Sequence, residues 1–183
     1  MQVSEDHSEW YVLRVTYQRE LIAKRRLDEF GIMSFVPTRK VEVRMGDGAK
    51  RVQRRALVHN YIFVFSNKQT IDRIKHFELP FLRYVMHTQN NERVIMRVPE
   101  EQMRSFMIVT GSEDERLQLL QPESIDLKLG AWVRVIGGVF SGAEGVLVKI
   151  PGFRSRRVVV EIDGVAMVAT PAIEREFLEI IEN

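Results

Sequence analysis

Asn60-Tyr61-Ile62-Phe63-Val64-Phe65 is a nearly unbroken run of apolar and aromatic residues in the first half of the chain. Short runs of this kind are typical of a strand that is buried on one or both of its faces within a sheet. Ser66 and Asn67 follow the run and favour a turn. The sequence therefore predicts a central strand over residues 60–65, around which the rest of a first domain is built.

The residues on either side of this strand show alternating strand and helix patterns. Aromatic and β-branched residues over 10–16 favour a strand, and apolar residues near helical spacing over 18–30 favour a helix with a basic outer face. The other expected elements are a short strand over 34–36, a charged hairpin with arms at 41–45 and 50–56, a helix over 70–77, strands over 82–87 and 94–98, and a helix over 99–109. This order predicts an α+β domain over residues 9–109, an antiparallel sheet layered with helices, preceded by a disordered N-terminus over 1–8.

The pattern changes after residue 109. Residues 110–126 lack sustained periodicity and carry an acidic excess, so we expect a flexible acidic linker, although Leu117, Leu119 and Leu120 leave open that part of it docks on a domain. From residue 127 onward the sequence consists of short runs of strand-forming residues separated by turn residues. These runs cover 132–136, 145–150, 157–162, 165–169 and 177–181. Residues 127–183 are therefore predicted to form a small, five-stranded, all-β barrel.

Composition argues against several classes of protein. The 183 residues include no cysteine, four histidines that never fall at ligand-pair spacing, and no apolar run long enough for a membrane span. A phosphate-binding Gly-x-x-x-x-Gly-Lys loop and a Gly-x-Ser-x-Gly elbow are also missing. We expect a cytoplasmic protein that is not an enzyme, needs no metal or cofactor, and makes no contact with a membrane.

The charge of the chain is distributed unevenly. The net charge is +2, but residues 1–109 sum to +6 and residues 110–183 sum to −4. The hairpin alone carries +5 over residues 39–55. A basic domain of this kind fits an anionic partner such as nucleic acid, although a basic face can also serve only to keep a helix or an edge hairpin solvated.

A second stretch, Gly130 to Val146, resembles the KOW motif of NusG-type transcription factors and of several ribosomal proteins. The positions that carry this likeness are Gly130, Val133, Gly137, Gly138, Phe140, Gly142 and Gly145. Glycines here permit positive φ angles or close backbone approach in a tight barrel, and Phe140 is expected to anchor the loop on the core. The runs 10–13, 35–37 and 58–64 occur in the order of the NusG N-terminal (NGN) domain, and the specialised RfaH-like or UpxY-like antiterminators are the most similar branch.

This resemblance implies two functional surfaces on the first domain. The residues that match the family's contact with the clamp helices of the RNA polymerase β′ subunit are Tyr61, Phe63, Tyr84 and Val58. The residues expected to contact nontemplate or upstream DNA, or nascent RNA, are Arg14, Arg19, Arg25, Arg26, Arg44, Lys50, Arg51, Arg54 and Arg55. The alternative for Tyr61 and Phe63 is that they fill the core of the sheet. Ribosomal protein S10 is a further implied partner of the KOW domain.

The predicted function is that of a monomeric antitermination and elongation factor, which suppresses polymerase pausing or termination at specific operons such as surface polysaccharide loci. The family's Gly-Arg signal for termination factor Rho is missing at Asp163-Gly164-Val165, which places Rho recruitment in doubt. Two alternatives remain open: a general NusG, and a ribosome-associated or RNA-binding KOW protein. A dense set of β-branched residues in the KOW region predicts a stable barrel rather than a helical form.

Overall fold

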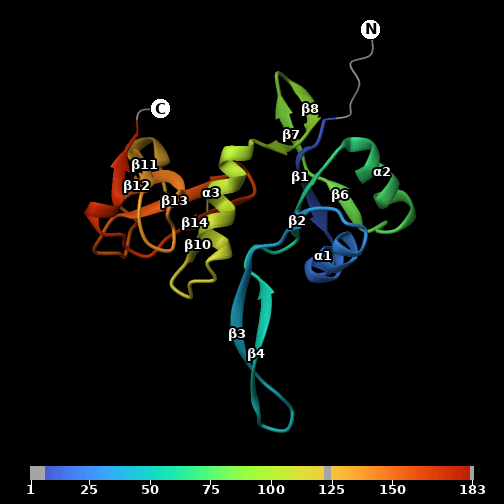
Figure 1. Cartoon of the computed structure of the whole chain (residues 1–183), viewed down its shortest axis with the longest axis horizontal. Helices are drawn as coiled ribbons and strands as arrows, with labels where there is room; N and C mark the ends of the chain where they lie inside the picture. The colour runs from blue at the N-terminus through green and yellow to red at the C-terminus, as the bar shows by residue number, and fades with distance from the viewer. Residues whose placement is uncertain (1–6, 122–124, 182–183) are drawn as a thin grey trace. The chain divides into compact units, whose positions relative to one another are not determined.

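The computed structural model describes residues 7–121 and 125–181 (Figure 1). The chain divides into two compact units: Met1–Val36 with Ala56–Glu100, and Pro37–Arg55 with Glu101–Asn183. Most of the N-terminal segment expected to be disordered, and Glu123 of the acidic segment, lie outside the described residues.

The first unit is built on an antiparallel sheet with the strand order β2-β5-β1-β6, and β9 also pairs with β1. Its elements are β1 (Glu9–Val15), α1 (Glu20–Glu29), β2 (Ser34–Phe35), β5 (Tyr61–Ser66), α2 (Lys68–Phe77), β6 (Leu82–Tyr84), the hairpin of β7 (Met86–Gln89) and β8 (Glu92–Ile95), and β9 (Arg97–Val98). Strand β5 pairs with β1 on one side and β2 on the other. The prediction of an interior strand at this position is therefore confirmed.

Helices α1 and α2 contribute to the same core as one face of this sheet. Ala23 and Leu27 of α1 and Ile71 and Ile74 of α2 belong to one buried apolar cluster. The sheet residues of this cluster are Tyr11, Leu13, Val15, Ile62, Val64 and Leu82. The alternation of side chains along each strand leaves the intervening residues of β1 and β5 on the opposite, second face.

The ends of both helices follow from local chemistry. Helix α2 begins two residues earlier than predicted because the Asn67 side chain caps it, accepting a hydrogen bond from the backbone N–H of Thr70 at 2.8 Å. Helix α1 ends before Gly31, which has a φ of +68°. A glycine takes this left-handed conformation without the steric cost that a Cβ imposes, so Gly31 ends α1 where the sequence predicts.

The second unit holds the basic hairpin, the third helix and a larger sheet. Its elements are β3 (Thr38–Arg44), β4 (Lys50–Ala56), α3 (Glu100–Gly111), β10 (Gln118–Leu120), β11 (Ala131–Val135), β12 (Glu144–Val148), β13 (Arg157–Ile162), β14 (Ala166–Ala169), β15 (Leu178–Ile180), and 3-10 turns at Leu127–Leu129 and Arg175–Phe177. The larger sheet is antiparallel, with the order β10-β14-β13-β12-β11-β15. We call residues 117–181 of this unit the β domain.

The β domain contains one strand that the sequence does not predict. The five expected strands correspond to β11 to β15, and β10 adds a sixth through the pairs Leu119 with Val168 and Leu120 with Met167. Leu120 packs against a buried cluster that includes Val146 and Met167. Part of the segment expected to be a linker is therefore a strand, because its pairing with β14 and the packing of Leu120 against this cluster outweigh the weak local pattern. The division of the chain into domains at residues 109 and 127 stays a prediction.

Candidate functional site

The pleat of the first sheet separates the aromatic residues that the sequence analysis grouped together. Tyr61 lies opposite Arg14, and Phe63 lies opposite Val12, so both aromatic residues occupy the second face. Tyr84 lies opposite Leu13, whose side chain belongs to the buried apolar cluster that the sheet forms with α1 and α2. The structure therefore places Tyr84 on the other side of the sheet from Tyr61 and Phe63, and the three do not form one surface.

The environment of Tyr84 is that of a structural residue. Its ring lies 5.9 Å from the ring of Tyr11, and the Lys75 ammonium lies 3.8 Å from its centroid. Its hydroxyl donates to the Lys68 carbonyl at 3.4 Å. Burial, followed by the neighbouring Asp72, raises the pKa of Tyr84 far above its ordinary value, so it stays a neutral donor. These contacts join α2 to β6.

Within the predicted polymerase-binding set, Tyr61 is the residue that lies on the second face of the sheet and is also partly exposed. Phe63 and Val58 are buried, with exposed fractions of 0% and 4%. The interpretation that Phe63 fills the core agrees with this burial. Tyr61 is partly exposed, and the register places it in one row with Arg14 and Arg83 across β5, β1 and β6. Two arginines that face each other directly across strands repel, so this row favours an anionic group close by.

Glu20 is a buried acid that no sequence pattern indicates. It is 2% exposed, and its Oε1 accepts a hydrogen bond from the backbone N–H of Asn60 at 2.6 Å. Asn60 has a φ of +69°, and its carbonyl accepts from the N–H of Val15 at 2.8 Å. Glu20 thus holds the sharp entry into β5, directly before Tyr61. The acid and the amide are forty positions apart in the sequence, so no local pattern predicts this contact.

The four arginines predicted on or beside α1 differ in their availability. Arg19 donates to the hydroxyl and the carbonyl of Thr16, at 2.9 and 3.1 Å, and lies 4.0 Å from the centroid of the Phe81 ring. Arg26 pairs with Glu29 at 2.6 Å. Arg14 and Arg25 are exposed and form no ion pair within the described part of the chain. The free charge near α1 is therefore concentrated on these two residues.

The hairpin of β3 and β4 presents its cations on an exposed two-stranded ribbon, visible as the long arm in Figure 1. Lys50 pairs with Glu42 at 2.6 Å. Arg44, Arg51 and Arg55 are exposed and have no ion pair among residues 7–121 and 125–181. Most of this charge is therefore left without a partner inside the protein.

Glu113 holds the base of the hairpin. Its carboxylate pairs with Arg54 at 3.0 Å, lies 3.6 Å from the Lys40 ammonium, and accepts from the Thr38 hydroxyl at 3.1 Å. Partial burial raises the pKa of Glu113, but Thr38 and the two cations outweigh it and hold that pKa below the ordinary value of 4.5. The acidic segment after α3 thus fixes the position of the basic hairpin, a role that no sequence pattern indicated.

The depressed pKa of Glu113 predicts an acid-sensitive hairpin. An acid whose folded-state pKa is lowered stabilises the protein above its unfolded pKa, and this stabilisation disappears as the pH falls through the folded pKa. Glu113→Gln should therefore lower stability at neutral pH by roughly 0.5 to 1 kcal/mol, and the difference from the parent should vanish on acidification from about pH 5 downward. Thermal unfolding as a function of pH measures this. Exposed Glu115→Gln is the control, and an equal effect in both variants would contradict the assignment.

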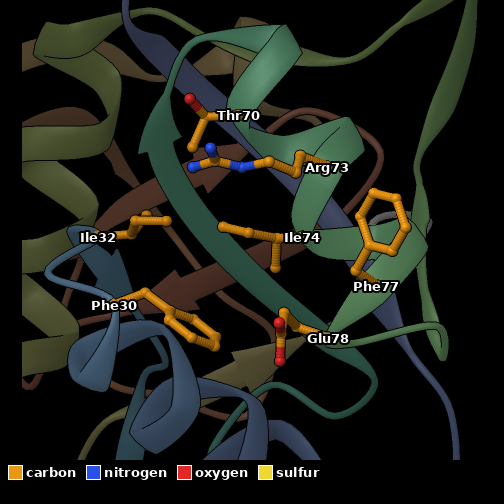
Figure 2. Close-up of a pocket in the computed structure, with 7 residues that line it drawn as sticks. All are labelled: Phe30, Ile32, Thr70, Arg73, Ile74, Phe77 and Glu78. Carbon is orange, nitrogen blue, oxygen red and sulfur yellow. The ribbon is translucent and has the colours of Figure 1, made fainter.

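A pocket of about 390 Å³ lies between the end of α1 and α2 (Figure 2). It is lined by Phe30, Ile32, Thr70, Arg73, Ile74, Phe77 and Glu78. Four of these seven side chains are apolar, and Phe77 is 72% exposed. Figure 2 shows the Arg73 side chain extending toward Thr70, and Glu78 at the opposite end of the pocket beside Phe30. This chemistry suits an apolar contact with a polar rim.

The KOW-like residues of the β domain have the structural roles that their types suggest. Gly138 and Gly142 have φ angles of +76° and +88°. Gly145 sits where a Cβ would lie 2.4 Å from the Val159 carbonyl oxygen. A Cβ at Gly130 would likewise meet the side chains of Val146 and Val148, and one at Gly137 would meet the Phe177 ring. Phe140 and Val133 are buried. Local backbone conformation thus accounts for Gly138 and Gly142, whereas close approach by other segments accounts for Gly130, Gly137 and Gly145.

The described residues offer neither a metal site nor a membrane-spanning helix. Residues 7–121 and 125–181 contain no group of three or more His, Asp or Glu side chains that could hold a metal ion. In the same residues, none of the helices has both the length and the apolar character that a membrane crossing requires.

Comparison with known proteins identifies the first part of the chain. The model of the NusG family, described as transcription termination factor nusG, matches residues 8–107, which is more than half of the 183 residues. No curated protein matches the chain closely enough to count as a relative. The matched range contains the sheet of the first unit, with its Tyr61, Arg14 and Arg83 row, and the basic hairpin. The chain therefore belongs to the NusG family, a family of transcription factors.

Proposed function

We propose that this protein is a transcription elongation and antitermination factor that binds RNA polymerase through the exposed row of Tyr61, Arg14 and Arg83 on the second face of its first sheet. The observation that carries the proposal is the placement of Tyr61, a partly exposed aromatic residue beside Arg14 on a rigid sheet, in a chain of the NusG family. Rigid aromatic side chains supply large contact area at little entropic cost and are frequent anchors of interfaces. The expected target is the pair of clamp helices of the β′ subunit.

The basic surfaces supply the second half of the proposed mechanism. Arg14 and Arg25 near α1, and the unpaired arginines of the hairpin, hold nontemplate or upstream DNA, or nascent RNA, by pairing with phosphates. No bond is made or broken. Contact with polymerase and nucleic acid together suppresses pausing or termination.

The β domain extends this proposal to a third partner. We assign it as a KOW domain, following the NGN domain over residues 9–109, on the glycine pattern between β11 and β12. Recruitment of a partner such as ribosomal protein S10 by this domain would raise the effective concentration of that partner at the polymerase. We favour a specific form of this proposal. In it, the protein is a monomeric factor of the specialised RfaH-like or UpxY-like branch, and it acts in the cytoplasm at operons such as surface polysaccharide loci.

The polymerase contact is tested with a Tyr61→Ala variant. The variant should lose about 2 kcal/mol of binding free energy for core RNA polymerase of the organism that encodes the protein, which is about a 30-fold weaker affinity, because an interface anchor is removed. Binding of the full chain is measured by fluorescence anisotropy or surface plasmon resonance, and circular dichroism checks the fold.

Tyr17→Ala is the matched control for this experiment. Tyr17 is 87% exposed and belongs to the same unit, so its loss should change the affinity less than twofold. Equal affinities of the Tyr61→Ala and parent proteins would refute the assigned surface. A parent protein that binds RNA or ribosomes but not polymerase would replace the proposal with the RNA-binding alternative.

A further inference from the structure

The loop between β12 and β13 concentrates positive charge in the β domain. Residues 145–160 contain four cations and no acid. These cations are Lys149, Arg154, Arg156 and Arg157. This contrasts with the net charge of −4 over residues 110–183 as a whole. The loop is therefore a local basic site within an acidic part of the chain.

Two of the four cations hold the loop in place. The Arg157 guanidinium lies 3.9 Å from the centroid of the Phe153 ring and donates to the Thr170 carbonyl at 2.9 Å. The Lys149 ammonium donates to the carbonyl of Arg154. Phe153 itself packs against the apolar cluster of the β domain, and its backbone N–H donates to Ile150 at 3.1 Å. The loop is thus attached to the sheet at both ends.

The other two cations, Arg154 and Arg156, remain available. Both are exposed, and neither forms an ion pair within the part of the chain that the structure describes. By contrast, two arginines that also follow α3 are paired within the chain: Arg134 with Glu144 at 2.8 Å, and Arg116 with Asp114 at 2.6 Å. A basic group that its own protein does not compensate gains most from an external anion.

We propose that Arg154 and Arg156 form a second nucleic-acid contact, which binds the phosphate backbone of a strand without reading its sequence. Guanidinium groups pair with phosphate through two parallel hydrogen bonds. The one aromatic ring of the loop, Phe153, is already covered by Arg157, so the loop offers charge without a free apolar anchor. Protein interfaces depend on such anchors, whereas backbone contacts to nucleic acid depend mainly on charge.

The test compares two double variants. Arg154→Ala/Arg156→Ala removes the proposed contact, and the control pair, Arg93→Ala/Arg175→Ala, removes the same charge from exposed positions elsewhere. Both pairs are placed in a full chain that already carries Arg44, Lys50, Arg51 and Arg55 as alanine, so that the hairpin does not mask the loop. Affinities for a labelled single-stranded RNA, a single-stranded DNA of the same sequence and a duplex DNA are measured at several salt concentrations, without polymerase.

Loss of two phosphate contacts should weaken single-strand binding about 20-fold and reduce the slope of log affinity against log salt by about 1.4. The control pair should change affinity less than twofold. A larger loss with RNA than with either DNA would identify nascent RNA as the source of the phosphates, and a larger loss with DNA would identify the transcription bubble or the upstream duplex. An equal loss with all three would support a general backbone contact.

Two results would overturn the proposal. One is an affinity of Arg154→Ala/Arg156→Ala equal to that of the control pair. The other is that polyglutamate displaces the labelled strand as well as unlabelled RNA of equal total charge does. That result would assign the loop to an acidic protein instead. Because polymerase is absent from these measurements, failure here is distinct from failure of the Tyr61 experiment.

Discussion

Replacing Arg44, Lys50, Arg51 and Arg55 of the hairpin with alanine should weaken DNA binding by the full chain on the order of 100- to 1,000-fold. Each phosphate that a cation neutralises contributes about 0.9 to the slope of log affinity against log salt for duplex DNA, so four lost contacts reduce that slope by up to about 3.6. Arg44, Arg51 and Arg55 have no acidic partner in the described part of the chain, so their charge is available. A salt titration with labelled upstream duplex measures both quantities.

The control for the hairpin removes four other exposed cations, namely Arg93, Arg104, Lys128 and Arg175. This variant has the same net charge, so a general effect of charge on DNA binding would appear equally in both. We expect the control to keep its affinity within about fivefold and its salt slope within about 1. Equal losses in the two variants would mean that the hairpin is basic only to remain solvated at its edges.

Gly145→Ala should destabilise the β domain by about 3 kcal/mol or more. The added Cβ would lie 2.4 Å from the Val159 carbonyl oxygen and 3.0 Å from Val158 Cγ1. The nearer atom belongs to the backbone of β13, which pairs with β12, so relief of the clash requires the two strands to separate. The expected result is a lower midpoint of chemical unfolding for this domain.

The two tryptophans of the chain allow this domain to be followed alone. In a Trp10→Phe background the fluorescence comes from Trp132 of β11, which packs against the apolar cluster of the β domain. Gly111→Ala is the control, because a Cβ at Gly111 meets no atom within 4 Å, and its stability should change by less than about 0.5 kcal/mol. A Gly145→Ala protein that unfolds at the same denaturant concentration as this control would disprove the tight approach of β12 and β13.

Much of the fold can be predicted from residue order because its signals are local. The apolar run before Ser66 predicts β5, Gly31 marks the end of α1, and the turn residues around Gly48 predict the hairpin. Gly138 and Gly142 of the KOW-like stretch likewise report a local backbone conformation, because both have positive φ angles. The excess of positive charge in the hairpin is a property of composition and needs no structure to be seen.

The tertiary structure decided how these elements present their side chains, because this depends on contacts between distant residues. Strand register, set when β1 pairs with β5 and β6, placed Tyr84 on the opposite face from Tyr61. Glu20 reached the N–H of Asn60, and Glu113 reached Arg54, through folding that no periodicity records. The free edge of β14 recruited β10 from a segment without a clear pattern of its own. Local propensity thus determined the elements, while pairing and burial between remote segments determined which residues face outward together.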